Sequence, residues 1–271
     1  MRTTDLGFDK EQIVMLRPNN NPAQEALQQA LYKIPEVKTS TFSSSVPGGN
    51  NYGAYSEIEN KKGDLQIANI DVYFVDFDYI PTFDIDLAAG RTFSRDFASD
   101  TTQAMLINES AVQLLGYSSA EEAIGRKFRQ WGREGQIVGV VKDFHFTSLQ
   151  EEIKPLSMRI EPDRTNLLAV KIDPGNVPGT IASIEKEWNK LLPQQPFDYY
   201  FLDEFFDRQY RSEQRFGALF LNFAGLAIFI SCLGLLGLAS YSTIQRRREI
   251  GIRKIVGASV SGIVNLLSIE F

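Results

Sequence analysis

The strongest pattern along the chain is an uninterrupted apolar stretch near its C-terminal end. Residues 216–244 contain no Asp, Glu, Lys, Arg or His over 29 consecutive positions. A helix needs roughly 20 apolar residues to cross a bilayer, and core helices of soluble proteins are rarely this long. The stretch lies far from the N-terminus, so it is not a secretory signal. It predicts one complete transmembrane helix.

Shorter patterns predict a mixed domain over residues 1–215, because the apolar runs are short and turn residues are frequent. The domain begins with a β-α-β pattern, in which Pro22 opens a helix and Pro35 closes it. It ends with a similar pattern around a helix at 178–192. The strands expected at the two ends cover residues 12–16, 37–45, 156–160, 167–172 and 197–202.

The two similar ends predict one subdomain formed by residues 1–48 and 155–205, with a β-rich subdomain, 49–154, inserted between them. Within the insertion we expect a loop at 46–53, strands at 65–73, 85–87 and 136–141, and helices at 108–115 and 119–124. The predicted fold class is therefore α+β, with a split α/β subdomain, an inserted β-rich subdomain, a long membrane helix and a short helix after it.

Charge is distributed unevenly along the chain. The net charge is -6 overall, with 32 acidic and 23 basic residues before Phe216 and 2 acidic and 5 basic residues from there on. The acidic total gives no reason to expect nucleic acid. The five basic residues after the span all lie within ten positions of its end: Arg246, Arg247, Arg248, Arg253 and Lys254. The positive-inside rule makes that end cytoplasmic and puts residues 1–215 outside the membrane.

Chemistry-bearing residues are few. The sequence has no Gly-x-x-x-x-Gly-Lys-Ser/Thr phosphate loop, so any ATP hydrolysis would come from a partner. His145, the single histidine, has no Gly-x-Ser-x-Gly turn to accompany it, and we expect a structural role. Asp203, Glu204 and Asp207 could hold a cation or act as acid and base, or else pair with Arg208 and Arg211. We expect no catalytic residue, no metal site and no cofactor.

Three further patterns have structural interpretations. Asp76 and Asp78, like Asp84 and Asp86, alternate as on the exposed face of a strand. An aromatic cluster could bind an apolar ligand, or supply core packing and an interfacial belt: Tyr199, Tyr200, Phe201, Phe205, Phe206 and Tyr210. Small residues recur on one face of the span and suit tight packing against another membrane helix: Ala224, Ala227, Ser231 and Gly234.

The segment after the span is basic and amphipathic if helical. Arg246 and Arg253, and Arg247 and Lys254, then lie two turns apart on one side, and Glu249 can reach Arg253. Composition alone indicates an anchor on the lipid surface.

The order Arg-Arg-Glu-Ile-Gly-Ile-Arg-Lys-Ile-Val-Gly-Ala-Ser, directly after an apolar span, resembles the signature of FtsX/MacB-type ABC transporter permeases. The outer domain resembles the periplasmic core domain of that family, as found in Bacteroidetes-like permeases with two core domains, through Ser-Ser-Val-Pro-Gly-Gly, Ala-Gly-Arg-Thr-Phe, Asn-Glu-Ser-Ala-Val and Gly-Val-Val-Lys-Asp-Phe-His-Phe. The resemblance implies a coupling helix, within residues 245–258, that docks on a cytoplasmic ABC ATPase. Its residues are Arg246, Arg247, Arg248, Glu249, Ile250, Gly251, Ile252, Arg253, Lys254, Gly257 and Ala258.

The resemblance also implies a dimeric permease in the bacterial inner membrane that passes ATP-driven motion to its periplasmic domain, for export or release of a peptide, antibiotic or lipoprotein. A membrane-anchored sensor or binding module, a regulator of cell-wall hydrolases, and a hydrolase using the Asp203 group remain alternatives. We expect the chain to be incomplete at both ends, with residues 259–271 beginning a next membrane helix. We therefore expect a piece of a longer membrane protein.

Overall fold

The computed structural model describes residues 6–19, 22–49, 51–147, 152–257, 259 and 262, with side chains described outside 207–218. Two compact units are present, Met1–Asp207 and Arg208–Phe271, and each is described by itself. The first is a mixed α+β domain, as the sequence predicts, and the second is helical.

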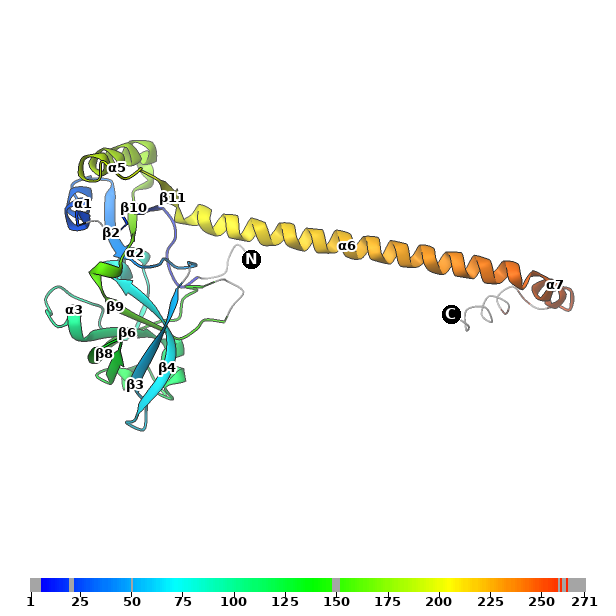
Figure 1. Cartoon of the computed structure of the whole chain (residues 1–271), viewed down its shortest axis with the longest axis horizontal. Coiled ribbons are helices and arrows are strands. Elements are labelled where there is room, and N and C mark those ends of the chain that lie inside the picture. Colours follow the sequence, from blue (N-terminus) through cyan, green and yellow to red (C-terminus); the bar gives the residue numbers. More distant parts are fainter. Residues whose placement is uncertain are drawn as a thin grey trace. The chain divides into compact units, whose positions relative to one another are not determined.

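One part of the first unit is a four-stranded sheet covered by two helices. Its strand order is β11 (Tyr199–Phe201), β1 (Ile13–Leu16), β10 (Leu167–Ile172) and β2 (Val37–Ser43), with each neighbouring pair antiparallel. Helices α1 (Gln24–Leu31) and α5 (Val177–Leu191) lie together beside it (Figure 1). Their apolar faces, including Leu27, Leu31, Ile184 and Trp188, bury against Val14, Leu16 and Val170. Strands from both ends of the domain thus share one core.

The other part is a closed ring of six strands. The order is β4 (Leu65–Val75), β3 (Tyr52–Glu59), β7 (Lys127–Gln130), β8 (Arg133–Val141), β6 (Ala104–Asn108) and β9 (Leu156–Ile160). Parallel pairing of β9 with β4, from Asp71↔Leu156 to Val75↔Ile160, closes the ring into a small barrel. Strand β5 (Leu87–Gly90) adds to β8, and one residue pair, Ser43↔Val75, joins the barrel to β2.

The barrel interior is packed and contains one polar layer. Ile58, Ile70, Ile107 and Phe128 belong to its apolar core. The buried Gln130 amide donates hydrogen bonds to the hydroxyl oxygens of Ser56, at 2.8 Å, and Ser157, at 3.0 Å. These bonds link β7 to β3 and β9 across the interior.

Short helices complete the first unit. They are α2 (Tyr79–Phe83), α3 (Asp100–Gln103), α4 (Glu109–Leu114) and the 3₁₀ turns Glu121–Ala123, Pro162–Arg164 and Pro174–Asn176. The prediction that Asp76, Asp78, Asp84 and Asp86 lie on a strand face is wrong, because β4 ends at Val75 and β5 begins at Leu87. Asp76 instead accepts hydrogen bonds from Thr41, Phe42, Gln28 and Asp78.

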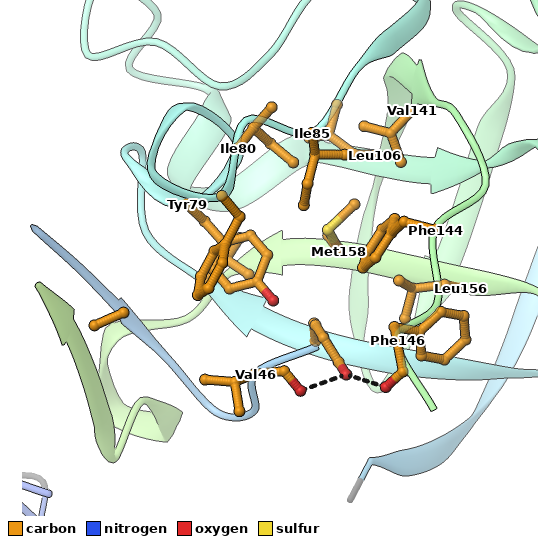
Figure 2. Packing of buried hydrophobic residues seen from close by; sticks show 14 of the residues in the cluster. Val46, Tyr79, Ile80, Ile85, Leu106, Val141, Phe144, Phe146, Leu156 and Met158 are labelled. Carbon is orange, nitrogen blue, oxygen red and sulfur yellow. Dashed lines mark hydrogen bonds between the residues drawn. The ribbon is translucent and has the colours of Figure 1, made fainter. Parts of the chain in front are cut away.

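A third core joins the two parts of the first unit. It includes Val46, Phe144, Phe146, Leu156 and Met158 (Figure 2). The Tyr73 hydroxyl lies 3.1 Å from the Val46 carbonyl oxygen and 2.9 Å from that of Phe146, drawn as dashed lines in Figure 2. A single buried hydroxyl therefore links three segments of the chain.

Helix α6 (Leu202–Gln245) begins directly after β11, and α7 (Arg247–Ile255) follows it after one residue. In the described part of the chain, Leu219–Gln245 is the one stretch whose length and composition suffice to cross a membrane. Its 27 residues overlap the predicted span, 216–244.

Candidate functional site

The basic segment after the span forms the helix α7. Gln245 ends α6, and Arg246 stands between the helices, its carbonyl accepting the Ile250 N–H at 3.0 Å. The Glu249 carboxylate lies 2.6 Å from the Arg253 guanidinium, which confirms the expected ion pair. Gly257, with φ +96°, follows the last turn, where a left-handed residue commonly ends a helix. The predicted site residue Ala258 lies outside the described residues.

The apolar side of α7 is open to solvent in this chain. Ile252, Ile255 and Val256 are all exposed, with Ile255 at 88%. Arg253 is held in place by Glu249, whereas among the described residues no carboxylate lies within ion-pair distance of Arg247, Arg248 or Lys254. A surface that is both cationic and apolar can dock on an acidic, partly apolar protein groove or on anionic lipid headgroups.

The small residues predicted for helix packing lie in the candidate span. Ala224, Ala227, Ser231 and Gly234 follow one another at intervals of three and four residues on α6, and all four are exposed. The Ser231 hydroxyl donates to the Ala227 carbonyl at 2.9 Å. The face is therefore smooth, and its hydroxyl needs no partner from lipid or another helix.

The start of α6 is part of the core of the first unit. Leu202 is fully buried and Phe206 is 6% exposed. The Phe206 ring lies 5.7 Å from that of Phe8, between ring centres. It also lies so close to Gly48 that an added Cβ there would be 2.5 Å from the ring. We call Gly48, Phe8, Leu202 and Phe206 the joint, because they bind the first turn of the long helix to the domain.

The joint was not found from the sequence, although one of its four residues, Gly48, falls in a segment that carries the family resemblance. Gly48 belongs to the Ser-Ser-Val-Pro-Gly-Gly segment, and its N–H donates to the carbonyl of Phe146, in the Lys-Asp-Phe-His-Phe segment, at 3.1 Å. Tyr73 bonds both segments. A single sequence carries no signal that these distant residues meet.

The other resembling segments stabilise turns of the barrel. Asn108 caps α4 by accepting the Ala111 N–H at 3.1 Å, and also accepts the Leu156 N–H at 2.8 Å. Ser110 donates from its N–H and its hydroxyl to the two oxygens of Asp143, at 3.0 and 2.7 Å. These contacts make the segments structural supports.

Arg91 forms a two-point ion pair with Asp100 at 2.6 and 2.7 Å. Asp100 is 1% exposed and also accepts the Ser94 N–H at 2.9 Å. Burial alone would raise the pKa of the Asp100 carboxyl, but the Arg91 guanidinium and the Ser94 N–H together hold it below its usual value. The pair fixes the loop that precedes α3.

The carboxylates considered for catalysis do not form a described site. Asp203 accepts the Glu204 N–H at 2.7 Å, and the side chains of Asp207, Arg208 and Arg211 lie outside the described residues. The His145 N–H donates to the Leu6 carbonyl at 3.0 Å. Within the described ranges, no group of three or more His, Cys, Asp or Glu side chains could hold a metal ion.

Comparison with known proteins identifies the family. A family model described as the MacB-like periplasmic core domain matches residues 2–186. The macrolide export ATP-binding/permease protein MacB of Sodalis glossinidius (strain morsitans) is 24% identical over 213 residues, which cover 75% of this chain and 33% of that protein. The chain thus spans about a third of the length of this relative.

One solved structure supports the fold. The periplasmic region of MacB from Actinobacillus actinomycetemcomitans has a TM-score of 0.54 at 13% identity, covering 74% of this chain and 94% of that one. The extracellular domain of the noncanonic ABC-type transporter YknZ from Gram-positive bacteria has a TM-score of 0.49 at 14% identity, covering 69% and 97%. With the family model matched over most of its length, the chain belongs to the MacB-like periplasmic core domain family of ABC transporter permeases.

Proposed function

We propose that this chain is the part of an ABC transporter permease that passes ATP-driven motion from a cytoplasmic ATPase to a periplasmic domain. The observation that carries the proposal is the joint: in a domain of this family, the helix that contains the candidate span begins inside the domain core, with Leu202 and Phe206 buried. A displacement of this first turn would act directly on the core residues packed against it, because packed interiors have few voids to absorb it.

The proposed path starts at α7. Binding of ATP to the partner would move the surface on which α7 docks, with Arg246, Arg247, Arg253 and Lys254 supplying charge and Ile252 and Ile255 supplying apolar contact. The 27 residues of the candidate span extend about 40 Å at about 1.5 Å per residue, more than the roughly 30 Å hydrocarbon core. A continuous helix of that length transmits displacement across the bilayer.

The remaining assignments follow from this role. The positive-inside rule supports a cytoplasmic α7 and a periplasmic first unit. Within that unit the β-rich part extends past the predicted 49–154, and the α/β part does not begin again at 155, because β9 (Leu156–Ile160) pairs with β4 and β6 of the ring. Residues 216–244 then span the inner membrane, and Ala224, Ala227, Ser231 and Gly234 pack against another helix of a dimeric permease. The work performed would be export or release of a peptide, antibiotic or lipoprotein. The named relative combines ATP-binding and permease functions in one protein.

A second candidate rests on α7 itself. Its uncovered basic and apolar surface also fits a lipid headgroup layer, which would make the chain an anchored sensor, a binding module or a regulator of cell-wall hydrolases. The two functions differ in what α7 contacts.

The test reverses the charge of α7 in the full-length parent protein. Arg246, Arg247, Arg253 and Lys254 are changed to Glu, and association with the ATPase and stimulated ATP hydrolysis are measured. The matched control changes the three arginines to Lys, which retains attraction to anionic lipid but loses two-point binding of carboxylates. We expect the reversed variant to lose association and stimulation. Full association and stimulation by the reversed variant would refute docking and favour the lipid anchor.

A further inference from the structure

One end of the barrel opens into a pocket of about 430 Å³. Its walls include Ser44, Tyr52, Phe74, Trp131, Arg164 and Asn166. These residues come from the starts and ends of strands and from the turns between them. The mouths of barrels are among the places where proteins most often bind small molecules. We call this pocket the barrel mouth.

Trp131 occupies its place in the barrel mouth in a strained conformation. It is the first residue of the two-residue turn between β7 and β8, with φ +49°, and Gly132 follows with φ +77°. Such turns are normally made by Asn, Asp and Gly, because bulky residues rarely adopt positive φ. Strain of this kind is commonly retained where a side chain has a task. Here the result is an indole ring that remains 45% exposed.

Two aromatic rings and two guanidinium groups are stacked at the barrel mouth. The Trp131 ring lies 5.9 Å from that of Phe74. Arg164 lies 5.3 Å from the centres of both rings, and Arg159 lies 5.3 Å from Phe74 and 5.6 Å from Trp131. Tyr52 also lines the pocket and is 69% exposed. A ligand entering the pocket meets flat apolar surfaces beside fixed positive charge.

The barrel mouth holds three guanidinium groups, those of Arg133, Arg159 and Arg164, against two carboxylates, those of Glu161 and the lining residue Asp163. Arg133 and Arg159 share one carboxylate, Glu161, at 3.3 and 3.2 Å. Burial lowers the pKa of Arg159 to about 10, with Glu161 opposing the shift and Arg133 and Arg164 adding to it. Among the described residues, no carboxylate lies within ion-pair distance of Arg164. An anion at Arg164 would relieve repulsion among the three guanidinium groups.

We propose that the barrel mouth binds small molecules or chain ends in which a carboxylate is attached to an apolar or aromatic group. The Arg164 guanidinium accepts the carboxylate in a two-point contact, as planar guanidinium groups commonly do. Trp131 and Tyr52 cover the apolar group. The Ser44 hydroxyl oxygen accepts the Phe74 N–H at 3.0 Å, which leaves its own hydrogen for the ligand. This binding activity is independent of the transmission role.

The test uses the full chain in detergent and two probes that differ only in charge, N-acetylphenylalanine and N-acetylphenylalaninamide. Trp131 is the reporter, because the other tryptophan, Trp188, is fully buried. We expect a saturable change in fluorescence with the carboxylate probe and binding at least about tenfold weaker with the amide, the loss expected for a charge-assisted hydrogen bond.

Variants assign the effect to the barrel mouth. Arg164→Gln, at an exposed position, should weaken binding of the carboxylate probe by about tenfold or more. Arg129→Gln, the same change on β7 outside this pocket, should leave it unchanged, and Trp131→Phe should abolish the fluorescence response. Equal binding of both probes, no saturable response, or full affinity in Arg164→Gln would each overturn the proposal.

Discussion

Replacing Gly48 by Ala should weaken the joint, and the structure gives the size of the effect. Gly48 has φ +76°, where a residue with a Cβ is strained by about 1–2 kcal/mol. The new Cβ would also lie 2.5 and 2.6 Å from two ring atoms of Phe206. Forcing extra atoms into a packed core typically costs about 1–3 kcal/mol. We expect a total loss of about 2–5 kcal/mol in the free energy of unfolding of the first unit.

A matched control separates strain from collision. Gly116 has nearly the same φ, +77°, and an added Cβ there would meet nothing within 4 Å. Gly116→Ala should therefore cost only the strain, about 1–2 kcal/mol. Urea unfolding of each variant, followed by the fluorescence of the buried Trp188, gives both values.

A double-mutant cycle tests whether Phe206 is the residue struck. Phe206→Leu removes the ring atoms nearest the new Cβ, so Gly48→Ala should cost about 1–3 kcal/mol less in that background. Costs that add within about 0.5 kcal/mol would refute the contact between Gly48 and Phe206. A Gly48→Ala variant no less stable than Gly116→Ala would refute the reasoning as well.

Three further predictions concern buried polar groups. Burial raises the pKa of the Asp76 carboxyl from its ordinary 3.8 to about 6, so the folded state holds this proton more tightly than the unfolded state does. The free energy of unfolding should therefore fall by up to about 3 kcal/mol as the pH rises from about 4 to about 7. Urea titrations should show this dependence in the wild type and not in Asp76→Asn. Arg91→Met leaves the Asp100 carboxylate buried without its partner, which should cost about 3 kcal/mol at pH 7. The cost should be smaller in acid, because the buried carboxyl of the variant, no longer held ionised by Arg91, takes up a proton more readily; equal costs in thermal unfolding at pH 7 and in acid would contradict this. Tyr73→Phe should cost about 0.5–1.5 kcal/mol in urea unfolding, because the hydroxyl's hydrogen bonding to the Val46 and Phe146 carbonyls is lost while the Gly49 and Gly48 N–H groups still donate to them; the exposed Tyr55→Phe should cost little.

The elements with long or clearly bounded apolar patterns were the predictable ones. Proline residues bound the pattern that became α1, and the apolar spacing of Ile181, Ile184 and Trp188 indicated α5. Strands β3, β6 and β7 were missed. Strand β6 has only five residues and runs directly into α4, and β3 begins inside a segment of turn residues. Whether these segments form strands depends on the strands they pair with in the ring, and a local sequence pattern does not reveal those pairings.

The candidate sites also differ in whether the sequence predicted them. The basic helix α7 was predicted because its residues are consecutive, and its Glu249–Arg253 pair follows from helical spacing. The joint and the barrel mouth were not predicted. Tyr73 and Phe146 are 73 positions apart, and Trp131 meets Arg159 only because the barrel closes. Sites formed by distant residues appear only when the topology is known.

The position of β1 also determines the order in which the domain can fold. The first strand of the domain pairs with β10 and β11, the last two strands. The barrel closes only when β9 pairs with β4. Contacts between such distant segments carry a high cost in loop closure and slow folding. During synthesis, β1 lacks its neighbour β10 until residue 172 has been made and its neighbour β11 until residue 201, and α6 begins at the next residue. The domain therefore completes its sheet only when the segment leading to the candidate span is being made.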